Sequence, residues 1–284
     1  MACHHNGLGK QHSKVMIGLA ALAVFAIRGV PLSAAEQLRS DTVKAFNTYV
    51  EQREKQMAQE LSAGPFLQID GFTAVERKKD YGLLKKGEVM TERMPLSEQI
   101  TVPHGLIHHW IGMVFIPGVS LARTLQFVQD YNNQYKFYAP DVQRSRLVQR
   151  NGNDFTVFLR LRKSKIITVI LDTDYDVKYV PISGDRAASY SYSTRIAEVE
   201  NAGKPNESDK PVGNDSGFMW RLNSYWRFLQ RDGGVYVQLE AISLTRDIPV
   251  GLGWLVRPFV TSIPRESIEF TLNRTRDALV DPKP

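Results

Sequence analysis

Three histidines are the residues of this sequence whose types and spacing first suggest metal chemistry. His104, His108 and His109 lie close together, and imidazole nitrogens are common zinc ligands. His108 and His109 are neighbours on a predicted strand, so their side chains point to opposite faces and cannot both reach one ion. No acidic ligand lies close to them in the sequence. We therefore interpret them as ordinary histidines of a strand and expect no metal site.

Alternate carboxylates at Asp172, Asp174 and Asp176 suggest a second kind of chemistry. Three acids on one face of a strand end could bind calcium or share a proton. The run DTDYD, however, lacks the glycine and the distal glutamate of a calcium-binding loop. We interpret it as a solvated turn.

Motifs for nucleophilic catalysis or cofactor binding are missing from the sequence. It contains no Gly-x-Ser-x-Gly elbow, phosphate-binding loop or dinucleotide-binding glycine pattern, so we assign no catalytic residue and expect no cofactor. The glycines of Gly251–Trp254 precede Pro258, and we interpret that segment as a flexible flap. Arg246 ends a predicted strand. It could bind an acidic head group or pair with Asp247 or Glu266, and both interpretations stay open.

The first 35 residues have the pattern of a secretory signal peptide. Lys10 and Lys14 precede an apolar run of 13 residues, Val15–Ile27, and small residues follow up to Ala35. Arg28 ends the run before the ~20 apolar residues that a membrane span needs. We expect cleavage near Ala35 and export to a periplasmic or extracellular location.

Removing this leader changes the charge and cysteine content on which function classes depend. The leader holds three of the 36 basic residues and no acid, which leaves 33 basic and 30 acidic residues, a net charge of +3. No basic cluster remains that could neutralise several phosphates, so we expect no nucleic acid partner. Cys3 is the single cysteine. Disulfides, thiolate catalysis and cysteine-bound metals are therefore excluded for the mature chain.

Helical periodicity marks the N-terminal half of the mature chain. Apolar residues recur at helical spacing from Asp41 to Leu61, with Asp41 as the expected N-cap. The segment 66–96 is less regular, and we expect a turn and one strand near its end. A strand over 104–116 precedes a short helix that Ser120 caps.

The second half is dominated by strand patterns. Residues 154–162 alternate apolar and polar side chains, and residues 165–182 and 187–200 continue the sheet. Gly233 and Gly234 predict a tight hairpin that would place Trp226 opposite Ala241, Phe228 opposite Leu239 and Arg227 opposite Glu240. A terminal helix is expected over 264–280. This order indicates an α+β protein, a large antiparallel sheet with helices on one face.

Two segments resemble a known superfamily. FVQDYNNQYKFYAPDVQRSRLV and LTRDIPVGLGWLVRPFVTSIPRESIEFTLNRTRDAL are similar to the start and the end of START-like proteins of the polyketide cyclase and lipid-transfer type. The resemblance covers roughly residues 104–280 and implies a helix-grip fold, a curved antiparallel sheet around a long C-terminal helix with an apolar cavity between them. The domains expected are a signal peptide (1–35), an N-terminal helix and strand extension (36–100) and the START-like domain (101–284).

This resemblance implies where a ligand would bind. The rings of Tyr131, Tyr135, Phe137 and Tyr138, just before Pro140, would lie at one end of the cavity or pack as ordinary core. The candidate ligand-binding residues come from the last strands and the flap: Tyr190, Tyr192, Trp226, Phe228, Val237, Leu239, Arg246, Trp254 and Phe259.

The function expected from these observations is an exported, monomeric binding or carrier protein for a lipid or other apolar small molecule. Transient contact with a membrane stays open. One alternative is a cyclase- or hydrolase-like enzyme that uses the same cavity, with a tyrosine or an Arg-Asp pair as acid. Another is an interaction protein that acts through its N-terminal extension, which predicts an exposed apolar stripe on the helix Asp41–Leu61.

Overall fold

The structure, a computed structural model, describes residues 36–95, 99–248 and 262–281. Its main sheet has ten antiparallel strands in the order β2-β4-β12-β11-β8-β7-β6-β5, with β3 paired to β4 and β9 paired to β8. These strands are β2 (Met90–Arg93), β3 (Ile100–Val102), β4 (Gly105–Pro117), β5 (Val142–Asn151), β6 (Asp154–Ser164), β7 (Thr168–Ser183), β8 (Arg186–Glu200), β9 (Ser208–Asp209), β11 (Arg221–Arg231) and β12 (Gly234–Arg246). A separate two-stranded sheet pairs β1 (Glu36–Gln37) with β10 (Asn214–Asp215).

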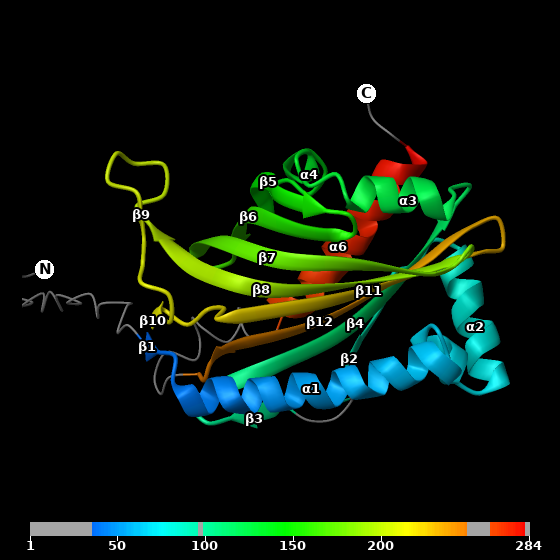
Figure 1. The fold of residues 1–284 in the computed structure, drawn as a ribbon, viewed down its shortest axis with the longest axis horizontal. Helices are drawn as coiled ribbons and strands as arrows, with labels where there is room; N and C mark the ends of the chain where they lie inside the picture. The colour runs from blue at the N-terminus through cyan, green and yellow to red at the C-terminus, as the bar shows by residue number, and fades with distance from the viewer. Residues whose placement is uncertain (1–35, 96–98, 249–261, 282–284) are drawn as a thin grey trace, which may run out of the picture. The chain divides into compact units, whose positions relative to one another are not determined.

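Helices cover both faces of the main sheet (Figure 1). The helices are α1 (Ser40–Ala63), α2 (Ala74–Lys85), α3 (Leu121–Val128), α4 (Gln134–Phe137) and α6 (Ile263–Val280), with a 3₁₀ turn, η1 (Gln68–Gly71). On the concave face, α3 and α6 pack against the sheet in the largest apolar cluster. On the convex face, α1 packs in a second cluster. The curved sheet around the C-terminal helix is the helix-grip arrangement that the sequence predicts. The prediction of helices on one face alone was wrong.

Most long elements lie close to their predicted positions, and the local errors have identifiable causes. The helix α2 was missed, although Thr73 and Glu76 form a capping box at its start and the pattern Thr-x-x-Glu is a known signal for one. The N-cap of α1 is Arg39 rather than Asp41. Asp172 is inside β7, not in a solvated turn, and it is buried because it pairs with Arg160.

The hairpin between β11 and β12 has a different register from the predicted one. Arg231 pairs with Gly234, so the central turn residues are Asp232 and Gly233. Both have left-handed φ angles, 58° and 76°, and Asp-Gly suits this turn because aspartate tolerates that conformation. Trp226 therefore lies opposite Leu239, Phe228 opposite Val237 and Arg227 opposite Gln238.

The convex face beneath α1 combines apolar burial with a buried ion-pair network. Phe46, Val50 and Met57 are buried against the sheet. The stripe that the interaction hypothesis required to be exposed is therefore covered, which contradicts that expectation.

Glu240 is at the centre of this network. It accepts hydrogen bonds from Arg53 Nε at 2.6 Å and from His109 Nε2 at 2.7 Å. Tyr49 of α1 contacts the other nitrogen of His109 at 2.7 Å. Burial by itself raises the pKa of Glu240, but the hydrogen bonds from His109 and Arg53 outweigh it and lower the pKa to about 2. These contacts fix α1 to the centre of the sheet.

A glycine in β4 sets how closely α6 approaches the sheet. A Cβ at position 112 would be 2.8 Å from Leu272 Cδ1 and closer still to Ile268 Cγ2. Both side chains belong to the buried face of α6. No side chain larger than hydrogen fits at position 112 without moving the helix.

We predict that Gly112→Ala destabilises the protein by about 1–3 kcal/mol, because an extra methyl group in a packed core forces its neighbours to shift. Gly184→Ala is the matched control, since a Cβ there meets nothing within 4 Å. Urea unfolding of both variants measures the difference. Equal stability of the two would show that α6 does not rest on β4 at this point.

We predict that Glu240→Gln destabilises the protein at pH 7 by about 1–3 kcal/mol, because Arg53 then loses its most buried carboxylate partner and keeps its pair with Glu60. The folded-state pKa of about 2 lies below the ordinary value of ~4.3. The charged carboxylate therefore stabilises the fold above pH ~4.3, and this contribution is lost as the pH falls toward 2. Urea unfolding measured between pH 7 and pH 2 should show that the difference in unfolding free energy between wild type and variant becomes smaller as the pH falls. The exposed Glu51→Gln serves as control, and a gap that does not change with pH would contradict the assignment.

Candidate functional site

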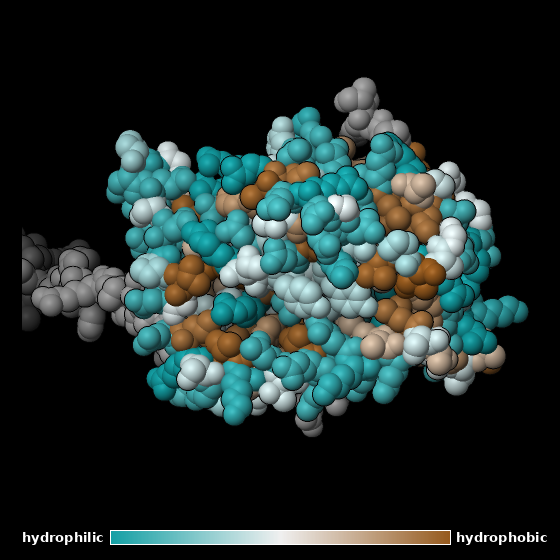
Figure 2. All heavy atoms as spheres, viewed as in Figure 1, coloured by the Kyte–Doolittle hydropathy of each residue, from teal (hydrophilic) through white to brown (hydrophobic). Residues whose placement is uncertain are grey.

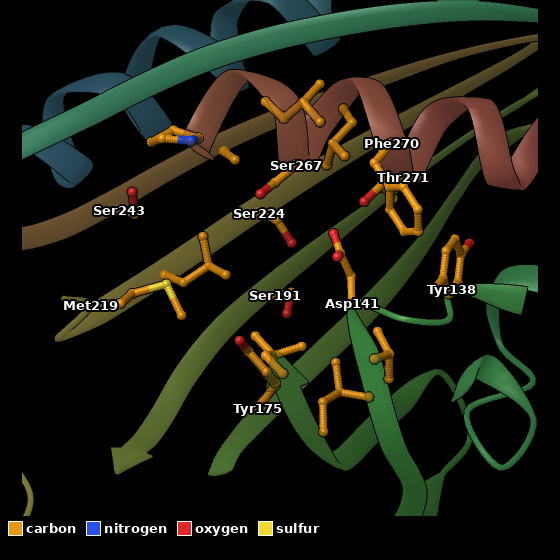
Figure 3. Close-up of a pocket in the computed structure, with 18 of the residues that line it drawn as sticks. Tyr138, Asp141, Tyr175, Ser191, Met219, Ser224, Ser243, Ser267, Phe270 and Thr271 are labelled. Atoms are coloured by element: carbon orange, nitrogen blue, oxygen red, sulfur yellow. The ribbon is translucent and has the colours of Figure 1, made fainter. Parts of the chain in front are cut away.

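A cavity of about 290 Å³ lies between the concave face of the sheet and α6 (Figure 3). Its described lining comes from β4, β5, β6, β7, β8, β11 and β12, from α6, from the end of α3 and the segment between α3 and β5, and from Phe218 and Met219 before β11. Most of these side chains are apolar, including Trp226 and Leu239 on the sheet and Phe270 on α6. The volume is near the lower end of the range for small-molecule sites, about 300–1,000 Å³.

Side-chain alternation decides which residues reach this cavity. Along β12, Leu239, Ala241, Ser243 and Thr245 line it, while the residues between them point to the convex face. The register continues the pattern into β11, because Trp226 lies opposite Leu239.

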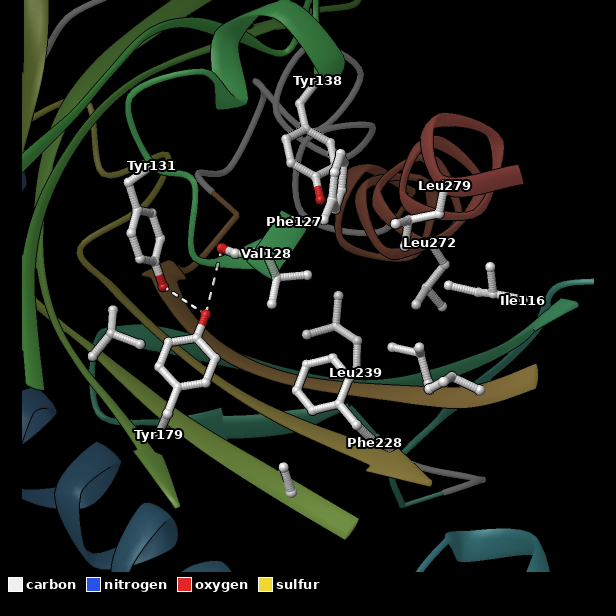
Figure 4. Close-up of a cluster of buried hydrophobic side chains, with 14 of the residues drawn as sticks. Ile116, Phe127, Val128, Tyr131, Tyr138, Tyr179, Phe228, Leu239, Leu272 and Leu279 are labelled. Atoms are coloured by element: carbon white, nitrogen blue, oxygen red, sulfur yellow. Dashed lines mark hydrogen bonds between the residues drawn. The ribbon is translucent and has the colours of Figure 1, made fainter. Parts of the chain in front are cut away.

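Three buried tyrosines, Tyr131, Tyr138 and Tyr179, are part of the cavity lining, and Figure 4 shows them within the apolar cluster. Tyr131 and Tyr179 hydrogen-bond to each other through their hydroxyls at 2.9 Å, and Tyr138 contacts the hydroxyl of Thr275 in α6 at 2.9 Å. Burial raises the pKa of Tyr138 to about 12, so it is neutral at pH 7. Of the ring cluster noted in the sequence, Tyr131 and Tyr138 line the cavity, whereas Tyr135 is 40% exposed.

Tyr175 differs from these tyrosines in having no partner for its hydroxyl. Its side chain is buried and lines the cavity (Figure 3). Among the described residues its oxygen has no partner in hydrogen-bond geometry, and the nearby hydroxyl of Thr173 donates to Leu159 O instead. Burial raises the pKa of Tyr175 to about 12, and the neighbourhood of Thr173 lowers it by less. An unsatisfied buried hydroxyl costs stability, and a ligand in this cavity could supply the missing partner.

Few charged groups reach the cavity. Of the described lining residues, Asp141 and Lys163 are charged, and they form an ion pair with each other. His108 also lines the cavity, and its Nε2 is 2.9 Å from the hydroxyl of Thr245. Burial, together with the nearby charge of Arg93, lowers the pKa of His108 to about 4, so its ring is neutral at pH 7.

The structure brings together some of the residues predicted from sequence. Trp226 and Leu239 line the cavity. Phe228 and Val237 belong to the same concave-face cluster and are fully buried, but they do not reach the cavity.

Two tyrosines of the predicted set do not line the cavity. Tyr190 and Tyr192 lie on the convex face with the cluster beneath α1. Tyr192 donates to Glu54 of that helix at 2.9 Å. Ser189 and Ser191 line the cavity in their place. The tyrosines were assigned to the concave face because they are bulkier than the serines. The convex face is also covered, by α1, and the tyrosines pack there.

Arg246 also does not line the cavity. Its backbone N–H donates to Gly217 O at 2.8 Å, and the alkyl part of its side chain packs over Gly217, where a Cβ would be 2.7 Å from Arg246 Cβ. Trp254 and Phe259 lie outside the described residues.

Several polar residues of the cavity lining were not singled out from the sequence. Ser191, Ser224, Ser243 and Tyr175 all line the cavity. The alternation of tyrosine and serine along β8 is visible in the sequence. To assign the serines to the cavity, one must also know that the opposite face of β8 is covered.

In the parts of the chain that the structure describes, no group of three or more His, Cys, Asp or Glu side chains could hold a metal ion. None of the described helices has the length and apolar character to cross a membrane. Figure 2 shows apolar patches dispersed among polar side chains on the face it presents.

No protein-family model and no curated protein matches this sequence. Among solved structures, the chain is similar to a STAR-related lipid transfer protein from Xanthomonas axonopodis, with 17% identity and a TM-score of 0.43 over 64% of this chain and 97% of that one. An aromatase/cyclase from Streptomyces is similar at 10% identity and a TM-score of 0.43, over 61% and 93%. The lipid transfer domain of human StarD13 is similar at 8% identity and a TM-score of 0.40, over 73% and 98%. At these values the likenesses carry no argument about ligand or reaction.

We predict that Tyr175→Phe stabilises the empty protein by about 1 kcal/mol, because it removes a buried hydroxyl that has no partner. Tyr179→Phe is the matched control. It removes a hydroxyl that is bonded to Tyr131, so it should destabilise. Thermal unfolding of delipidated protein measures both changes, and a loss of stability in Tyr175→Phe would show that its hydroxyl is already satisfied.

Proposed function

We propose that this protein binds and carries an apolar small molecule or lipid in the cavity between α6 and the sheet. The observation that carries the proposal is the cavity itself. Protein interiors are close-packed and contain few voids larger than a water molecule, whereas this one holds about 290 Å³ of space lined mostly by apolar side chains. A void of that size lowers stability, which a bound ligand would offset.

Burial of apolar surface would supply the binding free energy. At ~25 cal/mol per Å², a ligand that loses ~300 Å² of exposed apolar surface gains roughly 7 kcal/mol before ordering costs. The residues expected to make most of this contact are Trp226 and Leu239 on the sheet with Phe270 on α6.

A binding role fits the described lining better than the enzymatic alternative. General acid–base chemistry needs a carboxylate or imidazole that is free to accept a proton near the reacting atoms. Asp141 is engaged by Lys163. His108, the histidine of the described lining, is a weak base, because burial and the charge of Arg93 lower its pKa to about 4. The tyrosine hydroxyls are neutral donors, and a ligand can use them without reacting.

Export belongs to the same proposal. The basic and apolar pattern of residues 1–35 supports a secretory leader, so the mature carrier would begin near Glu36 and act, as a monomer, outside the cytoplasm. N-terminal sequencing of the protein purified from its own host tests this. A chain that still begins at Met1 would overturn it.

We predict that the protein purified from its own host carries an apolar molecule at close to one per chain, because the cavity would otherwise be empty. Solvent extraction and mass spectrometry measure this occupancy. Ala241→Trp should lower it at least tenfold, since Ala241 lines the cavity and the indole would fill it. Val148→Trp, at an exposed position, is the control. Equal cargo in both folded variants would place the binding site elsewhere.

A further inference from the structure

A line of polar groups crosses the floor of the cavity. Ser191 of β8 lies directly opposite Ser224 of β11, and Ser243 of β12 lies directly opposite His108 of β4. Ser224 pairs with Ala241, so Ser243 is its diagonal neighbour. Adjacent strands are about 4.8 Å apart, so these four residues span about 14 Å across the sheet. Figure 3 shows Ser191, Ser224 and Ser243 beneath α6.

The hydroxyls of this line have no protein partner. Ser191, Ser224 and Ser243 line the cavity without a side-chain hydrogen bond to another described residue, and the hydroxyl of Tyr175, on the next strand, is buried without a partner among the described residues. Polar groups in protein interiors are normally paired. One buried, unpaired tyrosine hydroxyl and three serine hydroxyls in a mostly apolar cavity therefore indicate a ligand that has polar atoms of its own.

The hydrogen-bond network also fixes what His108 offers. The hydroxyl of Thr245 donates its single hydrogen to Arg246 O at 2.9 Å. In its contact with Thr245, His108 must therefore donate from Nε2. Its Nδ1 is then an acceptor, and it has no partner among the described residues. Nδ1 can accept a hydrogen bond from a ligand group that donates one, such as a hydroxyl.

The described lining of the cavity does not favour an ionised ligand head group. A buried carboxylate or phosphate without a partner costs several kcal/mol. The one cation of the described lining, Lys163, is already paired with Asp141. No arginine lines the described part of the cavity, because Arg246 lies outside it. Hydroxyls and a neutral imidazole do not supply the positive charge that an anionic head group needs.

We propose that the cargo is an uncharged apolar alcohol whose hydroxyl bonds to the polar line of Ser191, Ser224, Ser243 and His108. This inference rests on the proposed binding function and specifies its ligand class. The apolar body of the molecule lies against α6 and the walls. Its hydroxyl accepts from a serine and donates to another serine or to His108 Nδ1.

Three probes of equal chain length separate the alternatives: dodecan-1-ol, dodecanoate and dodecane. Their affinities for the delipidated protein are measured at pH 8, where dodecanoate is ionised. The same measurements are made on the Ser191→Ala, Ser224→Ala double variant. The control is Ser208→Ala, at an exposed position on β9.

The expected result is that dodecan-1-ol binds at least fivefold more tightly than either dodecane or dodecanoate. In the double variant its affinity should fall to that of dodecane, while dodecane binding stays the same. Dodecanoate affinity equal to or above that of dodecan-1-ol would overturn the inference, as would an unchanged alcohol preference in the double variant. If none of the three probes binds, the proposed binding function itself fails, which is a different outcome from a wrong ligand class.

Discussion

The structure depends on a sheet that is buried on both faces. Side chains alternate between the faces of a strand, so each strand of the centre contributes one set to the surface under α1 and one set to the surface under α6. On the convex side, Arg53 and Glu240 attach α1 through a buried ion pair. On the concave side, Gly112 lets α6 approach β4 closely. The cavity occupies the space that α6 and the curved sheet enclose.

The two faces use their polar residues in opposite ways. Beneath α1, the charged groups are mutually satisfied, as in the contacts of Glu240 with Arg53 and His109. In the cavity, the buried hydroxyl of Tyr175 has no partner among the described residues, and the hydroxyls of Ser191, Ser224 and Ser243 line the open space. A satisfied network stabilises and specifies a fold. Polar groups that are kept unsatisfied at a cost in stability point instead to a ligand.

The sequence predicted the large elements because their periodicities are long and clear. The ends of α6 and the strand pattern of β6 follow from helical and alternating spacing alone. The missed helix α2 has a weak apolar pattern with one buried residue, Leu84, so periodicity gave no signal there. The predicted register of the β11–β12 hairpin was wrong by two residues. Either Asp232-Gly233 or Gly233-Gly234 could form the two-residue turn, and the observed pairing of Arg231 with Gly234 selects the first.

The sequence by itself determined that this chain is an α+β protein with a large sheet and a long terminal helix, since strand alternation and helical spacing are local patterns. Tertiary structure alone decided which face of each strand meets the cavity. Along β8, a tyrosine face and a serine face are equally regular as patterns, and only the docking of α1 assigns the tyrosines to the convex side. Residue type does not show which face of β8 meets the cavity, because burial of apolar surface stabilises the protein equally on either face. The polar line of the cavity therefore became visible only once both helices were in place.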